Sequence, residues 1–90
     1  MLLRVVVRGR VQGVGFRWFV REEARRRNLA GWVRNLPDGA VEVAAKGPHD
    51  DVLALRSALA CGPSGARVDA LDDVDDSAPT ELVRPFSIIR

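Results

Sequence analysis

A nine-residue stretch from Gly9 to Arg17, reading GRVQGVGFR, holds the residue types best suited to chemistry in this chain. Its three glycines and two arginines lie between a β-branched run and a helix-like run. Glycine allows successive backbone N–H groups to point into one concavity that can hold an anion. The stretch also opens a helix, where free N–H groups and the helix dipole favour negative charge and disfavour a cation such as Arg17. The pattern predicts a site for a phosphate-sized anion, although a simple strand-to-helix connection would use the same glycines.

Asn35 is a second candidate, near the end of an expected strand and on the side of that strand that carries Val33. An amide on the core-facing side needs hydrogen-bond partners. A functional role and a local role in closing a hairpin are both compatible with this position.

Other polar residues give weaker indications of chemistry. Asp72, Asp73, Asp75 and Asp76 lack the glycine and the closing glutamate of a calcium-binding loop, which favours a solvated acidic turn over a metal site. His49, the only histidine, begins a helix and has no serine or cysteine nucleophile motif beside it. We therefore expect no metal and no cofactor.

Composition limits the broad class. Ninety residues predict one domain, residues 1–90, with a small core. No apolar run approaches the roughly 20 residues of a membrane span, so we expect no membrane partner. The single Cys61 excludes an internal disulfide framework and suits a reducing, cytoplasmic compartment. We expect a monomer.

The charge is distributed unevenly along the chain. Residues 1–46 carry ten Lys/Arg and four Asp/Glu, a net charge of +6, whereas residues 47–90 carry four and eight, a net charge of −4. The basic half contains the glycine loop, and its field would attract a small anionic substrate or a nucleic acid.

Hydrophobic periodicity predicts the elements that must position these residues. We expect strands over Leu2–Arg8, Ala30–Leu36, Ala40–Lys46, Ala66–Leu71 and Pro85–Ile89, and helices over Phe16–Arg27 and from Pro48 or His49 to the residue before Gly62. Pro37-Asp38-Gly39 predicts a hairpin turn, and Asp72–Pro79 an acidic turn.

The first helix has its own local predictions. Glu22 with Arg26, and Glu23 with Arg27, have the i, i+4 spacing of helical ion pairs. Asn28 is expected to end the helix in the left-handed conformation.

The order β-α-β-β-α-β plus a terminal strand predicts an α+β, ferredoxin-like sandwich with both helices on one face of a mainly antiparallel sheet. RNA recognition modules share this outline and stack bases on aromatic residues of their central strands. Here Leu2–Arg8 and Ala40–Lys46 contain no aromatic residue, so we expect no nucleic acid partner.

Two segments together resemble the signatures of the acylphosphatase family. They are GRVQGVGFR at Gly9–Arg17 and GWVRNLPDGAVEVAAKG at Gly31–Gly47. The similarity continues through Gly62-Pro63, Ala66–Val68 and Phe86-Ser87-Ile88, and so covers nearly the whole chain. Asn28 stands where relatives usually have glycine, and asparagine can adopt the same conformation.

The resemblance implies a metal-independent hydrolase that converts an acyl phosphate to a carboxylate and inorganic phosphate. We also expect inorganic phosphate to inhibit this hydrolysis. It implies that Arg17 binds the phosphate and that Asn35 orients the attacking water. The implied phosphate-binding loop consists of Arg10, Val11, Gln12, Gly13, Val14 and Gly15.

Two alternatives stay open: an anion-binding or regulatory module, and an enzyme for carbamoyl phosphate similar to the acylphosphatase-like domains of hydrogenase-maturation proteins.

Overall fold

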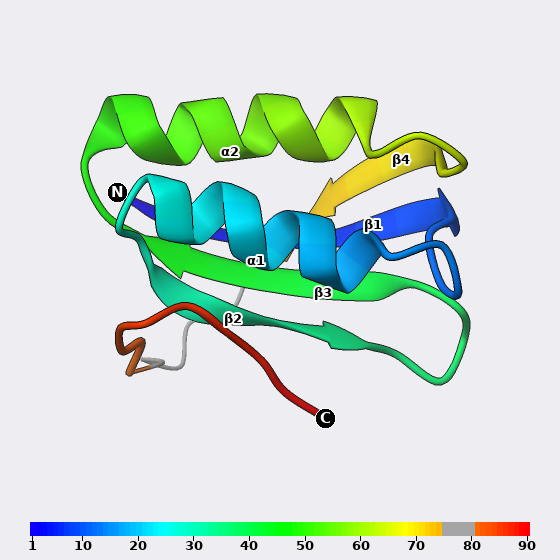
Figure 1. Cartoon of the computed structure of the whole chain (residues 1–90), viewed down its shortest axis with the longest axis horizontal. Helices are drawn as coiled ribbons and strands as arrows, with labels where there is room; N and C mark the ends of the chain where they lie inside the picture. Colours follow the sequence, from blue (N-terminus) through cyan, green and yellow to red (C-terminus); the bar gives the residue numbers. More distant parts are fainter. Residues whose placement is uncertain (75–80) are drawn as a thin grey trace.

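A five-stranded sheet forms one layer of the structure, a computed structural model that describes residues 1–74 and 81–90 (Figure 1). The strands are β1 (Leu2–Arg10), β2 (Ala30–Asn35), β3 (Val41–Lys46), β4 (Arg67–Asp73) and β5 (Ser87–Ile88). They are ordered β4-β1-β3-β2-β5. The first four pair antiparallel, and β5 adds to β2 in parallel.

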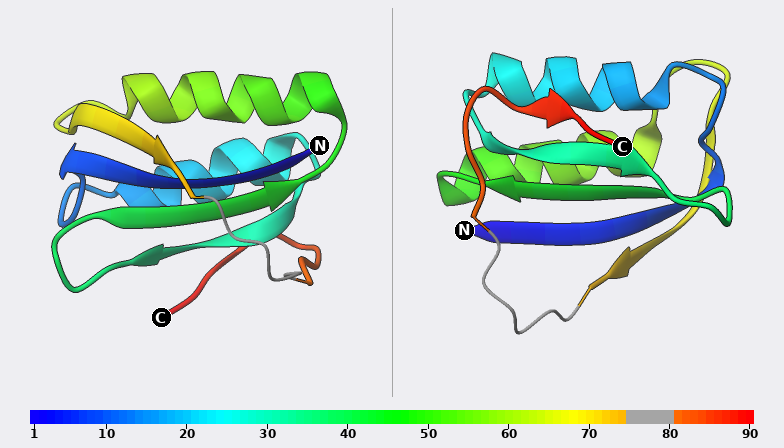
Figure 2. Two further views of the ribbon diagram at one scale, coloured as in Figure 1. Left: turned by 180° about the vertical axis from the view of Figure 1, so that it is seen from behind. Right: turned by 90° about the horizontal axis from the view of Figure 1, so that it is seen from below.

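Two helices, α1 (Phe16–Arg26) and α2 (His49–Cys61), cover the same face of this sheet, as both views in Figure 2 show. Each helix buries one stripe, namely Phe16, Val20 and Ala24 of α1 and Val52, Leu55 and Leu59 of α2. These side chains pack on the valines of the central strands to form the core. The expected ferredoxin-like βαββαβ sandwich with a short terminal strand is confirmed. No helix of the described residues is long and apolar enough to cross a membrane.

Strand β1 runs to Arg10, two residues beyond its expected end at Arg8. The pairing of β1 with β4 shifts register between Arg8 and Gly9, which marks a β-bulge. Gly9 has φ 135°, and a Cβ there would collide with the carbonyl oxygen of Arg67. Gly9 therefore allows the β1–β4 ladder to continue, and the loop proper begins at Val11.

Strand β4 likewise extends past its expected end at Leu71 and includes Asp72 and Asp73. The expectation that these two residues belong to an acidic turn was wrong. Arg8 Nε donates to Asp72 at 2.9 Å, and Arg56 Nη1 donates to Asp73 at 2.7 Å, so arginines neutralise both carboxylates within the strand. Asp75, Asp76 and the rest of the expected turn to Pro79 lie outside the described residues.

Helix α1 ends at Arg26, one residue earlier than expected. Asn28 has φ 54°, as predicted, and the Asn28 and Leu29 amides donate to the carbonyls of Arg25 and Ala24, completing a Schellman cap. The two i, i+4 ion pairs were wrong. Arg26 pairs with Glu23 at i, i+3, whereas Arg27 lies at the C-cap and pairs with Asp51 of α2.

The remaining boundaries differ by one or two residues. Strand β2 ends at Asn35, β3 begins at Val41, and β5 is confined to Ser87–Ile88. The glycine loop and the β2–β3 turn lie at the same end of the sheet (Figure 1), which brings the two candidate segments together.

Candidate active site

A pocket of about 310 Å³ lies where the glycine loop meets the start of α1 and the end of β2. Its lining comprises Val11, Gly13, Gly15, Phe16, Arg17, Trp18, Asn35 and Ile88. A larger pocket of about 640 Å³ includes Asn28 and Lys46 and lies at the opposite end of α1. The smaller pocket is the one that joins the two segments selected from the sequence.

The glycine loop forms an open cradle at the N-terminus of α1. Gly13 and Gly15 both have φ 75°, and a Cβ on either would meet no atom within 4 Å. Gly15 is the N-cap of α1 and provides no side-chain cap, and the first turn carries no acidic residue. The first N–H groups of a helix have no intrahelical partner, so these remain available to an anion.

Arg17 places a positive charge in the first turn of α1. Its side chain is partly buried and takes part in none of the ion pairs formed among the described residues. A cation at this end of a helix opposes the dipole, so an anion between Arg17 and the loop amides would relieve the conflict.

Asn35 ends β2 opposite Val41 of β3 and faces the pocket from the other side. Its side-chain Oδ1 is buried and accepts no hydrogen bond from the residues that the structure describes. A buried acceptor without a partner is unfavourable, so a donor entering the pocket, such as a water molecule, would satisfy it.

Gln12 has a role that the sequence did not reveal. Its Nε2 donates to the carbonyl oxygens of Leu36 and Ala40, at 2.9 and 2.8 Å. The Leu36 amide itself donates to the Ala40 carbonyl at 2.8 Å, so Gln12 binds at the closing pair of the β2–β3 hairpin. The glycine loop is thereby tied to the residue next to Asn35.

The same hairpin is held by Asp38 and Arg8. Asp38 accepts from the Ala40 amide at 3.0 Å and from Arg8 Nη1 at 3.0 Å. The Ala40 hydrogen bond, followed by the Arg8 hydrogen bond, lowers the pKa of Asp38 below its ordinary 3.8. Hydrogen bonds to Asp38 and then Asp72 raise the pKa of Arg8.

The structure brings together most of the residues selected from the sequence. Val11, Gly13, Gly15, Arg17 and Asn35 all line the pocket, whereas Arg10, Gln12 and Val14 do not. Arg10 is exposed in β1 opposite Arg67, and Val14 packs against the core.

Trp18 and Ile88 also line the pocket, and neither was among the residues selected from the sequence. Trp18 had a detectable signal, a large apolar residue directly after Arg17 and outside the buried helical stripe. Ile88 had none, because only the pairing of β5 with β2 brings it to the pocket. His49 and Cys61 are exposed and lie outside this pocket, and residues 1–74 and 81–90 contain no group of three or more His, Cys, Asp or Glu that could hold a metal ion.

Known proteins resemble this chain over nearly its whole length. Residues 3–88 match the sequence profile of the acylphosphatase family. An acylphosphatase of Pseudomonas paraeruginosa is 53% identical over 88 residues, covering 98% of this chain and 94% of that protein. One of Koribacter versatilis is 51% identical over 85 residues, covering 94% and 76%. The crystal structure of acylphosphatase from Bacillus subtilis has a TM-score of 0.89 and 42% identity, and each chain is covered completely. Because the profile and these relatives agree, the chain belongs to the acylphosphatase family, the hydrolases that act on acyl phosphates.

Proposed function

We propose that this enzyme hydrolyses acyl phosphates without a metal, with Arg17 and the glycine loop holding the phosphoryl group and Asn35 orienting the attacking water. One observation carries the proposal. An arginine outside every ion pair among the described residues and a buried, unpartnered Asn35 Oδ1 line the same pocket as Gly13 and Gly15.

The phosphoryl oxygens would be held by backbone amides between Val11 and Gly15 and by the first turn of α1. Arg17 supplies the positive charge, with a planar fork that forms two parallel hydrogen bonds and stays protonated. Because Arg10 lies outside the pocket lining, its side chain has no ligand role in this proposal. Phosphoryl transfer depends mainly on positioning and charge stabilisation, which these groups can provide without a metal.

The water would donate a hydrogen bond to Asn35 Oδ1, which aims its oxygen at phosphorus. The bond from water oxygen to phosphorus forms while the phosphorus–oxygen bond to the acyl group breaks, and the electron pair of that bond leaves with the carboxylate. A phosphoryl oxygen of the substrate takes the proton of the water, so the products are a carboxylate and dihydrogen phosphate. A neutral amide is no strong base, which suits a substrate with so good a leaving group.

The protein would act as a cytoplasmic monomer on a small acyl phosphate, and inorganic phosphate would bind the same cradle and inhibit competitively. Carbamoyl phosphate belongs among the substrates to be assayed, because no residue of the proposed phosphoryl cradle excludes it.

Hydrolysis of acetyl phosphate in excess chelator tests this proposal. Arg17→Ala should lower kcat/KM by about 10²-fold or more, because a preorganised group that meets charge in the transition state is lost. Arg17→Lys should recover little, since an ammonium cannot form the fork. Arg26→Ala is the matched control, as Arg26 lies in the last turn of the same helix and pairs with Glu23. Activity that requires a divalent ion, or an Arg17→Ala enzyme as active as Arg26→Ala, would contradict the proposal.

A further inference from the structure

We propose that the pocket of about 640 Å³ at the opposite end of α1 from the glycine loop is a second ligand site, and that it takes a small organic anion with an apolar body. This second pocket shares no lining residue with the candidate active site. It is therefore independent of the function proposed for Arg17 and Asn35.

Two cations line the second pocket. Lys46 ends β3, Arg84 lies in the segment that leads to β5, and both are exposed. Neither side chain takes part in an ion pair among the residues that the structure describes. None of the described residues that line the pocket is acidic. Because like charges repel, an anion bound between Lys46 and Arg84 would stabilise both.

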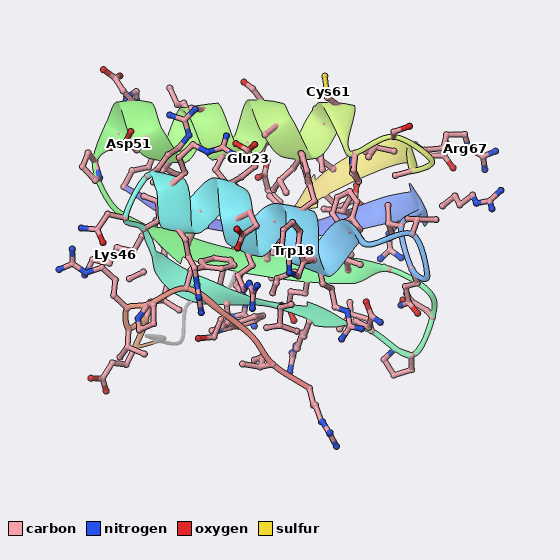
Figure 3. The ribbon with its side chains drawn as sticks, in the orientation of Figure 1. Trp18, Glu23, Lys46, Asp51, Cys61 and Arg67 are labelled. Carbon is pink, nitrogen blue, oxygen red and sulfur yellow. The ribbon has the colours of Figure 1, made fainter. Side chains whose placement is uncertain are left out.

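The pocket is remote from the glycine loop. Figure 3 shows Lys46 at one end of the molecule and Arg67, which lies opposite Arg10 in the sheet, at the other. An anion held by Lys46 therefore cannot reach the phosphate cradle, and the two sites can be occupied at the same time.

The backbone around the second pocket adds positive potential. Helix α2 starts there, with the lining residue Pro48 as its N-cap and no side-chain cap, so its free N–H groups and dipole favour an anion. Asp50 and Asp51 in the first turn offset part of this field, but neither lines the pocket. The ammonium group of Met1 donates to the carbonyl oxygen of Gly47, another lining residue, at 2.8 Å.

An apolar wall lies beside these charges. Val83 is 63% exposed and Leu82 is partly buried, and both line the pocket together with Ala30. The Val83 carbonyl accepts from the Gly31 amide at 3.0 Å, which holds this segment against β2. A ligand with an apolar body would remove the surface of Val83 from water. The volume lies within the usual range of ligand pockets.

Asn28 adds a hydrogen-bond donor to the pocket. It has φ 54° at the C-terminal cap of α1, and its side chain is exposed in the lining. Its amide group can donate to a bound anion. Because relatives usually have glycine at this position, the Asn28 side chain is an addition of this chain to the pocket. Asn28→Gly removes the amide and keeps the left-handed cap.

Two-dimensional NMR with benzenesulfonate as the probe tests the inference site by site. Benzenesulfonate should shift the amide signals of Lys46, Gly47, Val83 and Arg84 with a common dissociation constant. Sulfate, which lacks the apolar body, and benzyl alcohol, which lacks the charge, should each bind there at least about tenfold more weakly, because each can use only one half of the pocket.

Variants of the lining assign the binding to its residues. Lys46→Gln and Arg84→Gln should each raise the dissociation constant of benzenesulfonate about fivefold, the effect of one partly exposed charge. Asn28→Gly should raise it about twofold. Arg90→Gln is the matched control, because Arg90 is exposed, forms none of the ion pairs named among the described residues and lines neither pocket. It should leave the constant unchanged.

The second pocket would be excluded if benzenesulfonate shifted only signals of the glycine loop, such as those of Gly13 and Gly15. Equal affinity for benzyl alcohol, or the same loss in Arg90→Gln as in Lys46→Gln, would also overturn the proposal. Arg17→Ala should leave binding at the second pocket unchanged, so a failure of the phosphate assignment and a failure of this site are distinguishable.

Discussion

Arg17 and Asn35 could be selected from the sequence because each side chain lies in local surroundings where it needs a partner. Arg17 follows a glycine loop and begins a helix, where a cation needs an anion. Asn35 lies on the core-facing side of a strand, where an amide needs a partner. Gln12 could not be assigned in the same way, because its role depends on the carbonyls of Leu36 and Ala40, which are distant in the chain.

Gly15 and Gly65 allow a residue-scale test of the cradle. Both have positive φ, 75° and 89°, and a Cβ on either would meet no atom within 4 Å, but only Gly15 lines the pocket. Each change to alanine should lower the free energy of unfolding by about 1–2 kcal/mol, the cost of the left-handed conformation. Only Gly15→Ala should also weaken inhibition by phosphate, because Gly15 lines the pocket proposed to hold the anion. Melting curves and inhibition constants of both variants check this, and equal phosphate affinity in the two would argue against a binding role for the loop.

The elements themselves were largely predictable, and their ends were not. The alternation of apolar residues places each strand, but β1 and β4 extend through a bulge at Gly9 and through Asp72 and Asp73. In the β4 extension, Arg8 and Arg56 neutralise the two carboxylates from other elements. Local turn propensity could not anticipate that compensation.

Gln12 links the glycine loop to the β2–β3 hairpin. We therefore expect its substitution to slow catalysis more than destabilisation alone would. Gln12→Met keeps the side-chain length and removes both hydrogen bonds to the hairpin, which should lower the free energy of unfolding by about 1–3 kcal/mol. It should also lower kcat about tenfold or more, because Asn35 is no longer held against the loop. Urea unfolding and kcat are to be measured beside Gly65→Ala, the control for destabilisation. A Gln12→Met enzyme that is destabilised but keeps its full kcat would show that the tie is only structural.

The β2–β3 hairpin should also give the protein an acid-sensitive contribution to stability. The pKa of Asp38 is lowered in the folded protein, so its contribution is complete above its ordinary value of 3.8 and is lost as the pH falls through the folded value. The difference in free energy of unfolding between the wild type and Asp38→Asn should therefore be largest above about pH 5 and shrink toward about pH 2. Denaturant unfolding at a series of pH values measures it. A difference independent of pH would exclude a lowered pKa at Asp38.

At the scale of the whole molecule, the site exists because the sheet order brings together segments that are distant in the chain. The β-α-β-β-α-β pattern was readable from periodicity, and it places the glycine loop beside the β2–β3 turn. The third part of the pocket comes from β5, whose two residues are too few to show any period. Ile88 consequently entered the site only through its pairing with β2.

The basic half of the chain contains every element of the proposed phosphate site. Residues 1–46 include ten Lys/Arg against four Asp/Glu, and Gly13, Gly15, Arg17 and Asn35 all lie within them. A field of this sign attracts a small anion toward the pocket. The charge distribution and the proposed phosphate site therefore both favour an anionic substrate.

The central claim is that Arg17 holds the phosphoryl group while Asn35 orients the attacking water. One kinetic experiment tests this claim most directly. Turnover of an acyl phosphate by folded Asn35→Ala, titrated with inorganic phosphate, yields kcat and the phosphate inhibition constant together. We expect kcat to fall by about 10²-fold or more while the inhibition constant stays near the wild-type value, the pattern of a group used in the transition state. Arg17→Ala, measured alongside, should lose phosphate affinity as well as turnover. If Asn35→Ala loses phosphate affinity as severely as Arg17→Ala, or keeps the wild-type kcat, Asn35 does not orient the attacking water.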